Sequence, residues 1–349
     1  MKRLFAFLTV LALTMFWGCD QSHNPTQPGT NDADQFSIAK INDAELAEDL
    51  AEIEREHAEI EARAAEILAG LNAKAKAPVN RLAGGNKITV PDDYATIQEA
   101  VNAAAPGTKV KVKSGVYNEY VTVTTADLRI TGEGAPVLNG YIGIYYTSGV
   151  QLDGFTIDGY YDAILIYQSS DVTIKDNTIT GQRDGIDMFY ATGCLIKDND
   201  VSTDDEGIEM YKSHGNTLDE NISSGNKDEG LKMYRCDDNE IKGNEFNGSR
   251  TDEGIWMYWS HRNEIEDNVC NDNDDDGIAL FYSTDNTIGS DNICNNNGDC
   301  GIALYWYAND NMVKKNEAFD NGYYDIYNYS AYTSGNVFKK NDCVTTYGF

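Results

Sequence analysis

Four consecutive segments of the chain read DGIDMFYATGCLIKDN (residues 184–199), EGIEMYKSHGNTLDEN (206–221), EGLKMYRCDDNEIKGN (229–244) and EGIWMYWSHRNEIEDN (253–268). Each begins with an acidic residue and a glycine, continues with alternating apolar residues, and ends with an asparagine. Alternation with a period of two predicts a strand with one buried face. A repeat of 22 to 24 residues predicts a solenoid in which each coil packs on its neighbours.

The repeat extends well beyond these four segments. Apolar residues such as Ile196 and Val201 predict a second and a third short strand in each coil, with Gly- and Asn-rich turns between them. Three strands per coil give an all-β, right-handed parallel β-helix of about 9 to 11 coils over residues 86–349. The recurring asparagines should stack and bond to the turns above and below. A small residue opens the coils at Ala163, Gly185, Gly207, Gly230, Gly254, Gly277 and Gly301.

The segment that precedes the repeats reads ITVPDDYATIQEAVNAAAPGTKVKVKSGVYNEYVTV (residues 88–123). This segment and the repeats resemble the parallel β-helix repeat family, which includes pectate lyases, NosD-like periplasmic proteins and related carbohydrate-associated solenoids. The resemblance implies that residues 96–104 form a helix capping the N-terminal end, where a strand edge would otherwise be open. It implies the fold more than an activity, because one fold hosts many functions. The catalytic motifs of polygalacturonases, pectinesterases and mannuronan epimerases are missing from the sequence.

The N-terminus predicts export. Lys2 and Arg3 precede an apolar run that is too short to span a bilayer, and Gly18-Cys19 follows it. This pattern resembles a bacterial lipoprotein signal, which implies a signal peptide at residues 1–18 and lipidation of Cys19. We therefore expect a protein anchored in the outer membrane, the periplasm or the cell surface. Residues 19–41 are polar, contain Pro and Gly, and predict a flexible tether.

Residues 42–76 predict one long amphipathic helix, followed by a short linker at residues 77–85. Apolar residues recur at spacings of four and three between Leu46 and Leu71, with His57 among them. One interpretation is a coiled-coil stalk that forms a homo-oligomer through residues 46–71. The other is an amphipathic helix that lies on its own β-helix or acts as a spacer.

The charge excludes some partners. The chain has 57 acidic and 27 basic residues and a formal net charge of −30, so it should repel nucleic acid. A column of carboxylates precedes the coil-opening glycines, and such a column invites Ca²⁺, which prefers oxygen ligands. A solvated acidic face is the alternative. The candidate calcium ligands are Asp205, Glu206, Asp228, Glu229, Asp252, Glu253, Asp275 and Asp276.

A second column is aromatic. An aromatic residue stands four positions after each opening residue, and a second often follows it. By alternation these side chains should face away from the core, where they would stack either on each other or on sugar rings. Trp256 should likewise project outward. The candidate carbohydrate-binding residues are Tyr190, Tyr211, Tyr234, Trp256, Tyr258, Trp259, Tyr282 and Trp306.

Mixed charges on the same side provide candidate catalytic residues. Asp187 and Glu209 occupy equivalent positions in adjacent coils, with the separation of a retaining glycosidase pair. Alternatively, Lys212 or Lys232 beside Arg235 could abstract a proton from a uronate, as pectate lyase-like enzymes do. Surface ion pairs between coils are the third interpretation.

A copper cofactor is not expected. His214 and His261 lie two coils apart, and the methionines that follow the glycines should be core residues. The sequence thus predicts an exported β-helix that binds extracellular polysaccharide along its aromatic and acidic face. A polysaccharide lyase or glycoside hydrolase, and a structural or adhesive solenoid, are the alternatives.

Overall fold

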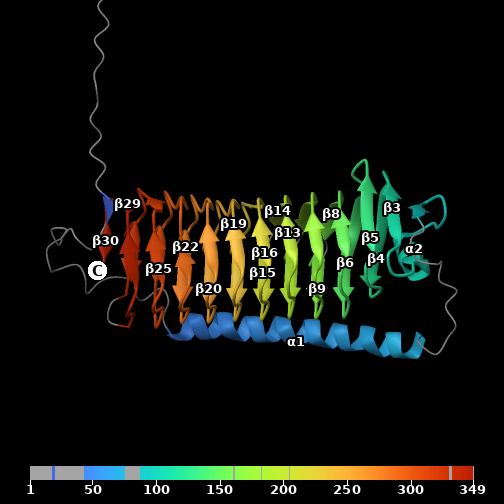
Figure 1. Ribbon diagram of the computed structural model, residues 1–349, viewed down its shortest axis with the longest axis horizontal. Helices are drawn as coiled ribbons and strands as arrows, with labels where there is room; N and C mark the ends of the chain where they lie inside the picture. Colours follow the sequence, from blue (N-terminus) through green and yellow to red (C-terminus); the bar gives the residue numbers. More distant parts are fainter. Residues whose placement is uncertain are drawn as a thin grey trace, which may run out of the picture.

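The computed structural model describes residues 18–19, 43–74, 87–159, 162–181, 183–203, 205–329 and 332–348. These residues form a right-handed parallel β-helix whose coils stack along one long axis, and helix α1 (Asp43–Lys74) runs beside the stack (Figure 1). The predicted fold class is confirmed. The predicted tether and linker, most of the predicted signal peptide and the side chain of Cys19 lie outside the described residues.

One wall of the solenoid is a sheet of twelve parallel strands, one from each coil. The sequence predicted about 9 to 11 coils, because the first coils lack the Gly–aromatic signature of the later ones. The strands are β2 (Lys87–Val90), β3 (Lys109–Lys113), β5 (Arg129–Glu133), β7 (Gln151–Asp153), β10 (Thr173–Lys175), β13 (Leu195–Lys197), β16 (Thr217–Asp219), β19 (Glu240–Lys242), β21 (Glu264–Glu266), β23 (Thr287–Ile288), β25 (Met312–Lys314) and β28 (Val337–Lys339).

The other two walls belong to one sheet of fifteen strands, because the long strand β6 pairs with both. The first of these walls continues from β6 (Val137–Tyr145) and β4 (Val116–Val123) through β8 (Thr156–Gly159), β11 (Thr178–Gly181), β14 (Asp200–Thr203) and β17 (Ile222–Ser223). The second carries the glycine-led segments, in β9 (Ile164–Tyr167), β12 (Ile186–Phe189), β15 (Ile208–Tyr211), β18 (Leu231–Tyr234), β20 (Ile255–Tyr258), β22 (Ile278–Phe281), β24 (Ile302–Leu304), β27 (Ile326–Asn328) and β30 (Thr346–Tyr347). A small third sheet holds β1 (Gly18–Cys19), β29 (Asn341–Cys343) and β26 (Glu317–Ala318).

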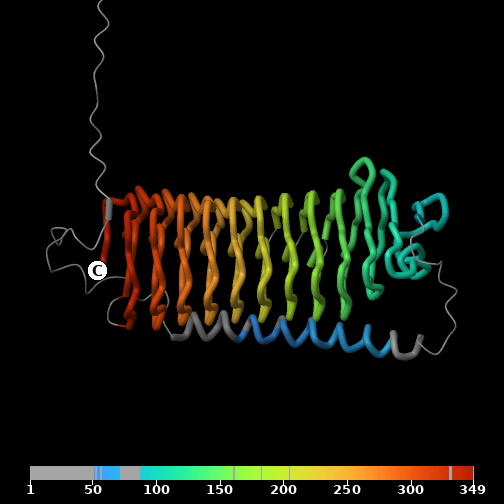
Figure 2. The backbone as a smooth tube through the Cα atoms, in the orientation of Figure 1, coloured from blue at the N-terminus to red at the C-terminus, as the bar shows by residue number. Residues whose placement is uncertain are grey.

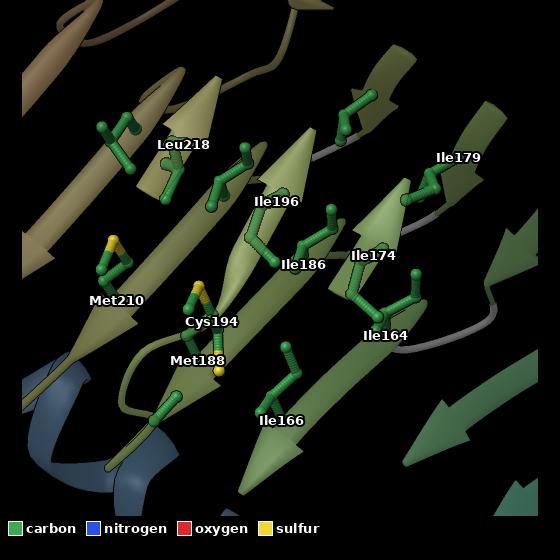
Figure 3. Packing of buried hydrophobic residues seen from close by; sticks show 14 of the residues in the cluster. Ile164, Ile166, Ile174, Ile179, Ile186, Met188, Cys194, Ile196, Met210 and Leu218 are labelled. Atoms are coloured by element: carbon green, nitrogen blue, oxygen red, sulfur yellow. The ribbon is translucent and has the colours of Figure 1, made fainter. Parts of the chain in front are cut away.

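The core fills the inside of the coils. Equivalent residues pair in register, so that Ile186 lies over Ile208 and Met188 over Met210. Figure 3 shows these side chains packing against those of the opposite walls, including Ile196. Within the described residues, five core cysteines are free thiols, which agrees with the expectation that Cys270 and Cys294 do not form a disulfide.

The asparagine column has the structural role that the sequence predicts. Asn221 is fully buried, donates from Nδ2 to the carbonyl oxygen of Ile196 (2.8 Å), and accepts a hydrogen bond from the backbone N–H of Asn199 (3.1 Å). Since each asparagine bonds to the coils on both sides, the column satisfies the polar atoms of buried turns.

The N-terminal end is covered by the predicted cap, helix α2 (Ile97–Ala103). The hydroxyl of Thr96 accepts a hydrogen bond from the backbone N–H of Glu99, as an N-cap residue does. Glu119 accepts from the backbone N–H groups of Ile97 and Gln98, both at 2.9 Å. No helix among the described residues is both long and apolar enough to cross a bilayer.

Candidate functional site: a covered aromatic ladder and the groove beside it

The last residue of each glycine-led strand builds a continuous aromatic ladder. Because the strands pair in register, the rings from Phe189 to Tyr258 stack from coil to coil. The rings of Tyr211 and Tyr234 are 5.4 Å apart and inclined by 8°, and those of Tyr234 and Tyr258 are 5.6 Å apart and inclined by 1°. We call this set the aromatic ladder; it comprises Tyr167, Phe189, Tyr211, Tyr234, Tyr258 and Phe281, all buried.

Helix α1 runs along the stacked coils (Figure 2), and its apolar side chains pack in one cluster with the aromatic ladder. Ile53, Ile60 and Ala64 are buried in the same cluster as the rings, at 1%, 2% and 0% exposure. The imidazole of His57 stacks on Tyr211 at 4.1 Å between ring centroids. Further along α1, the guanidinium of Arg63 donates to a carboxylate oxygen of Asp162 at 3.2 Å.

The spacing of the apolar residues explains why α1 fits there. The apolar positions of α1 recur every 3.5 residues on average, which advances about 5.3 Å along the helix axis at 1.5 Å per residue. The coils advance by about 4.8 Å. Nearly one apolar residue of α1 therefore meets each coil. The coiled-coil interpretation is wrong for the residues that the structure describes, because this face is occupied by the solenoid. The alternative, a helix lying on its own β-helix, is correct.

The candidate sugar-binding residues divide into two groups. Tyr211, Tyr234, Trp256 and Tyr258 are buried, and Trp256 is only 4% exposed. Alternation correctly directs Trp256 away from the core, but it is buried and its ring stacks on that of Tyr258, so the expectation of an exposed tryptophan is wrong. The second group is half-buried and packs against the same cluster; its members are Tyr190, Trp259, Tyr282 and Trp306.

One residue after each ring of the ladder, and at the equivalent turns of the two flanking coils, the backbone turns sharply. Lys212 has φ 46°, Arg235 φ 55° and Trp259 φ 49°, values in the left-handed region that favours Gly, Asn and Asp. In the other turn columns this conformation falls mostly on Gly, Asp and Asn. At the turns after the ladder no Gly, Asp or Asn occurs, so the conformational preference of the backbone does not explain which residue types stand there. We call these residues the left-handed column; they are Tyr146, Gln168, Tyr190, Lys212, Arg235, Trp259, Tyr282 and Tyr307.

A shallow groove follows the left-handed column along the solenoid. Its second edge lies two residues further on, where Ser148, Ser170, Thr192 and His214 pair in register from coil to coil. Two hollows occupy the groove, of about 770 Å³ beside Gln168 and about 470 Å³ beside Trp259, and both are lined by Tyr190 and Thr192. The sequence did not single out this second edge, although its constant offset from the aromatics was a usable signal.

The two cations of the left-handed column lie over aromatic faces. The Lys212 ammonium is 4.7 Å from the ring centroid of Tyr211, and the Arg235 guanidinium is 4.6 Å from that of Trp259. Such contacts hold a cation in place while its outer side stays in solvent.

The other candidate catalytic residues lie apart from this groove. Asp187, Glu209 and Lys232 occupy equivalent positions in three successive coils, as predicted, but they are 0%, 2% and 8% exposed. The Lys232 ammonium pairs with Glu206 at 2.6 Å and with Glu229 at 3.5 Å. Burial removes Asp187 and Glu209 from any substrate, whereas Lys212 and Arg235 are accessible. The five residues therefore do not form one catalytic site.

The acidic column is split in the same way. Asp205, Asp228, Asp252 and Asp275 are half-buried, while Glu206, Glu229, Glu253 and Asp276 are buried. Burial raises the pKa of Glu253 well above its usual range, with the charge of Asp275 adding to the effect. For Glu206 burial acts in the same direction, but the neighbouring Lys232 overrides it and lowers the pKa to about 2.

Few of these acids gather as a set of metal ligands. Among the described residues, the groups of three whose ligand atoms lie within 4.8 Å are Asp162, Asp184 and Asp187, and Asp184, Asp205 and Glu206. Only Asp205 and Glu206 belong to the predicted calcium set. The eight predicted calcium ligands therefore do not form one accessible column, because Glu206, Glu229, Glu253 and Asp276 are buried.

The comparisons with known proteins begin with a family model. The model of the periplasmic copper-binding protein (NosD) matches residues 126–288 and 247–348, which together make up well over half of the chain. The chain belongs to the NosD family. The family is described as periplasmic, in agreement with the export that the N-terminus predicts. None of the curated proteins compared with the chain matches it.

The NosD-family chain also resembles solved structures of parallel β-helices. The A-module of mannuronan C-5 epimerase AlgE4 from Azotobacter vinelandii is 15% identical, with a TM-score of 0.56 over 78% of this chain and 98% of that one. The alginate lyase from Paenibacillus sp. str. FPU-7 is 12% identical, with a TM-score of 0.53 over 76% and 98%. At these identities the likeness shows the fold alone.

Membership of the NosD family corrects the cofactor expectation. Copper was expected to be unlikely, and the family is described as copper-binding. The described residues themselves do not fit copper, which takes thiolate, thioether and imidazole ligands. Their clusters of three potential ligands are all carboxylates, and Met188 and Met210 are buried in the core. Burial raises the pKa of the Cys270 thiol well above its usual range, which disfavours the thiolate.

Proposed function

We propose that this protein binds a polysaccharide that lies in the groove beside α1, parallel to the solenoid axis. The observation that carries the proposal is the left-handed column. Each non-glycine residue in that conformation costs on the order of 1 kcal/mol or more, and eight of them follow one another without a Gly, Asn or Asp. A cost repeated in eight successive coils is explained if the large side chains serve a ligand.

The groove has the composition of a sugar site. Half-buried rings such as Tyr190 and Trp259 offer faces for the apolar sides of sugar rings, and the opposite edge offers the hydroxyls of Ser170 and Thr192. Its openness over several coils suits a polymer better than a small molecule. The names of the fold neighbours, mannuronan epimerase and alginate lyase, give the same substrate class.

The proposal differs from the sequence-based hypothesis in location. Binding is assigned to the groove and not to the aromatic ladder, because α1 covers the ladder. Glycoside hydrolase activity is not favoured, since Asp187 and Glu209 are buried away from the groove. Lyase activity through Lys212 beside Arg235 stays an alternative, because both residues line the groove. A structural or adhesive role without a ligand is an outcome of the test below.

The test fills the groove and leaves the fold intact. Thr192 is exposed and lines both hollows, so Thr192→Met places a long, uncharged side chain where the polymer would lie. The control is Thr217→Met, on the outward face of β16 in the twelve-stranded sheet. A polysaccharide array selects the ligand, and titration calorimetry compares the variants.

Thr192→Met should weaken binding at least tenfold with an unchanged melting temperature, and Thr217→Met should bind as the wild type does. Equal affinities of the two variants would place the polymer elsewhere. No binding of any polysaccharide would support a structural role.

We also propose that the mature protein is anchored through lipidated Cys19, on the evidence of the signal-like segment before it. Cys19→Ser should release the protein from the membrane fraction. Retention of the variant in that fraction would refute the lipid anchor.

A further inference from the structure

The cationic part of the groove stands out in a chain of net charge −30. Among the described residues, neither Lys212 nor Arg235 has a carboxylate within 4 Å. Some other bases of the solenoid do have one: the Lys227 ammonium lies 3.2 Å from a carboxylate oxygen of Asp205, and the Arg262 guanidinium lies 2.8 Å from one of Asp238. What distinguishes Lys212 and Arg235 from other described bases is that both line the same hollow of the groove.

Aromatic rings hold the side chains of both bases in position. Lys212 lies between the rings of Tyr211 and Tyr190, at 4.7 and 5.5 Å from their centroids. Arg235, in the next coil, lies over Trp259 and Tyr234. The rings fix two flexible side chains before any ligand arrives, which lowers the entropy cost of binding.

His214 supplies a third donor. Its Nδ1 accepts a hydrogen bond from the backbone N–H of Asp237 at 3.0 Å. A backbone N–H can only donate, so Nδ1 carries no proton and the proton of the neutral ring is on Nε2. His214 lines the same hollow as Lys212 and Arg235 and offers an N–H donor there.

One acid also lines this hollow, and its charge is already engaged. The carboxylate of Asp237 accepts from the backbone N–H of His261 at 2.9 Å and from the guanidinium of Arg262 at 3.2 Å. Three donors, two of them cationic, therefore face one neutralised acid, and this set matches a bound carboxylate.

We propose that this part of the groove is a carboxylate subsite and that the ligand is an acidic polysaccharide of the polyuronate class. This inference rests on the proposed function. Lys212 and Arg235 belong to adjacent coils about 4.8 Å apart. One sugar residue of an extended 1,4-linked chain advances by a similar length, so successive uronates meet successive coils. The hydroxyl-rich part of the groove, around Ser148 and Ser170, takes sugars through their hydroxyls.

The experiment compares two forms of one polymer. A β-1,4-linked mannuronate hexamer and its carboxyl-reduced, neutral form are titrated into the full-length protein in the presence of EDTA. The wild type should bind the acidic hexamer at least tenfold more tightly. Added salt should weaken only the acidic ligand, because charge contacts at a surface are screened.

The variant Lys212→Met/Arg235→Met keeps the apolar stems and removes both charges. It should bind the acidic hexamer no better than the neutral one. The control Lys242→Met removes an exposed charge from β19, on another wall, and should keep the wild-type preference.

The outcomes separate the two proposals. Equal binding of both hexamers by the wild type refutes the carboxylate subsite and leaves the polysaccharide groove standing. A preference that survives in the double variant also refutes the subsite. If the wild type binds neither hexamer nor any polymer on the array, the proposed function itself fails.

Discussion

Ile60 is the residue of α1 whose replacement tests most clearly whether the helix is docked on the solenoid. Ile60 is 2% exposed and packs in the cluster of the aromatic ladder. Ile60→Ala removes three buried carbon atoms, and the burial of each contributes about 0.8 kcal/mol to the free energy of folding. The rigid rings cannot close the space left behind, so the total cost should be about 2–5 kcal/mol.

The assay is denaturant unfolding followed by tryptophan fluorescence. Trp256 is buried in the same cluster, so undocking of α1 should shift its emission to longer wavelength. Leu68→Ala is the matched control, because Leu68 lies on the same helix and is 41% exposed. The control should change stability by less than about 0.5 kcal/mol. Equal effects of the two substitutions would show that α1 does not rest on the ladder.

Two further predictions concern the turns and the buried acids. Arg235→Gly should be more stable than Arg235→Ala by about 1 kcal/mol, because glycine adopts φ 55° without strain, although both lose the ligand contact; equal midpoints in urea would remove the strain argument. Burial, together with the charge of Asp299, raises the pKa of Asp276 from 3.8 to about 7, so the folded state holds a proton there that the unfolded state releases. This stabilisation is complete at acidic pH and is lost as the pH rises through about 7, by on the order of a few kcal/mol at most. The melting temperature should therefore fall between about pH 5 and pH 8, and less so in Asp276→Asn; identical pH profiles would contradict the assignment.

The solenoid could be predicted from the sequence because its signals are local and repeated. The alternation after Gly185 and Gly207 sets the strand and its inner face. The constant repeat sets the register, so Asp187 lies beside Glu209 as expected. The asparagine column follows from the same register.

The position of α1 could not be predicted, because the spacing of its apolar residues fits either of two packing partners. Apolar residues every 3.5 positions suit a neighbouring helix, and they also nearly match the pitch of the coils. Alternation likewise shows that Trp256 points away from the core, but not that it is buried in a cluster to which a distant segment contributes. The groove remained hidden for a related reason. Adjacent aromatics such as Tyr258 and Trp259 look alike in sequence, and only the left-handed turn at Trp259 separates a buried ring from an accessible one.

The most direct test of the central claim compares Trp256→Ala with Trp259→Ala for stability and for affinity toward the polysaccharide that the array selects. Trp256 is buried in the cluster of the aromatic ladder, so its loss should lower the stability by about 3–5 kcal/mol and leave the affinity of the folded protein unchanged. Trp259 borders the groove, so its loss should weaken binding by about 1 kcal/mol or more at little cost in stability. If Trp256→Ala loses affinity while Trp259→Ala binds normally, the polymer lies on the ladder, and the groove assignment is wrong.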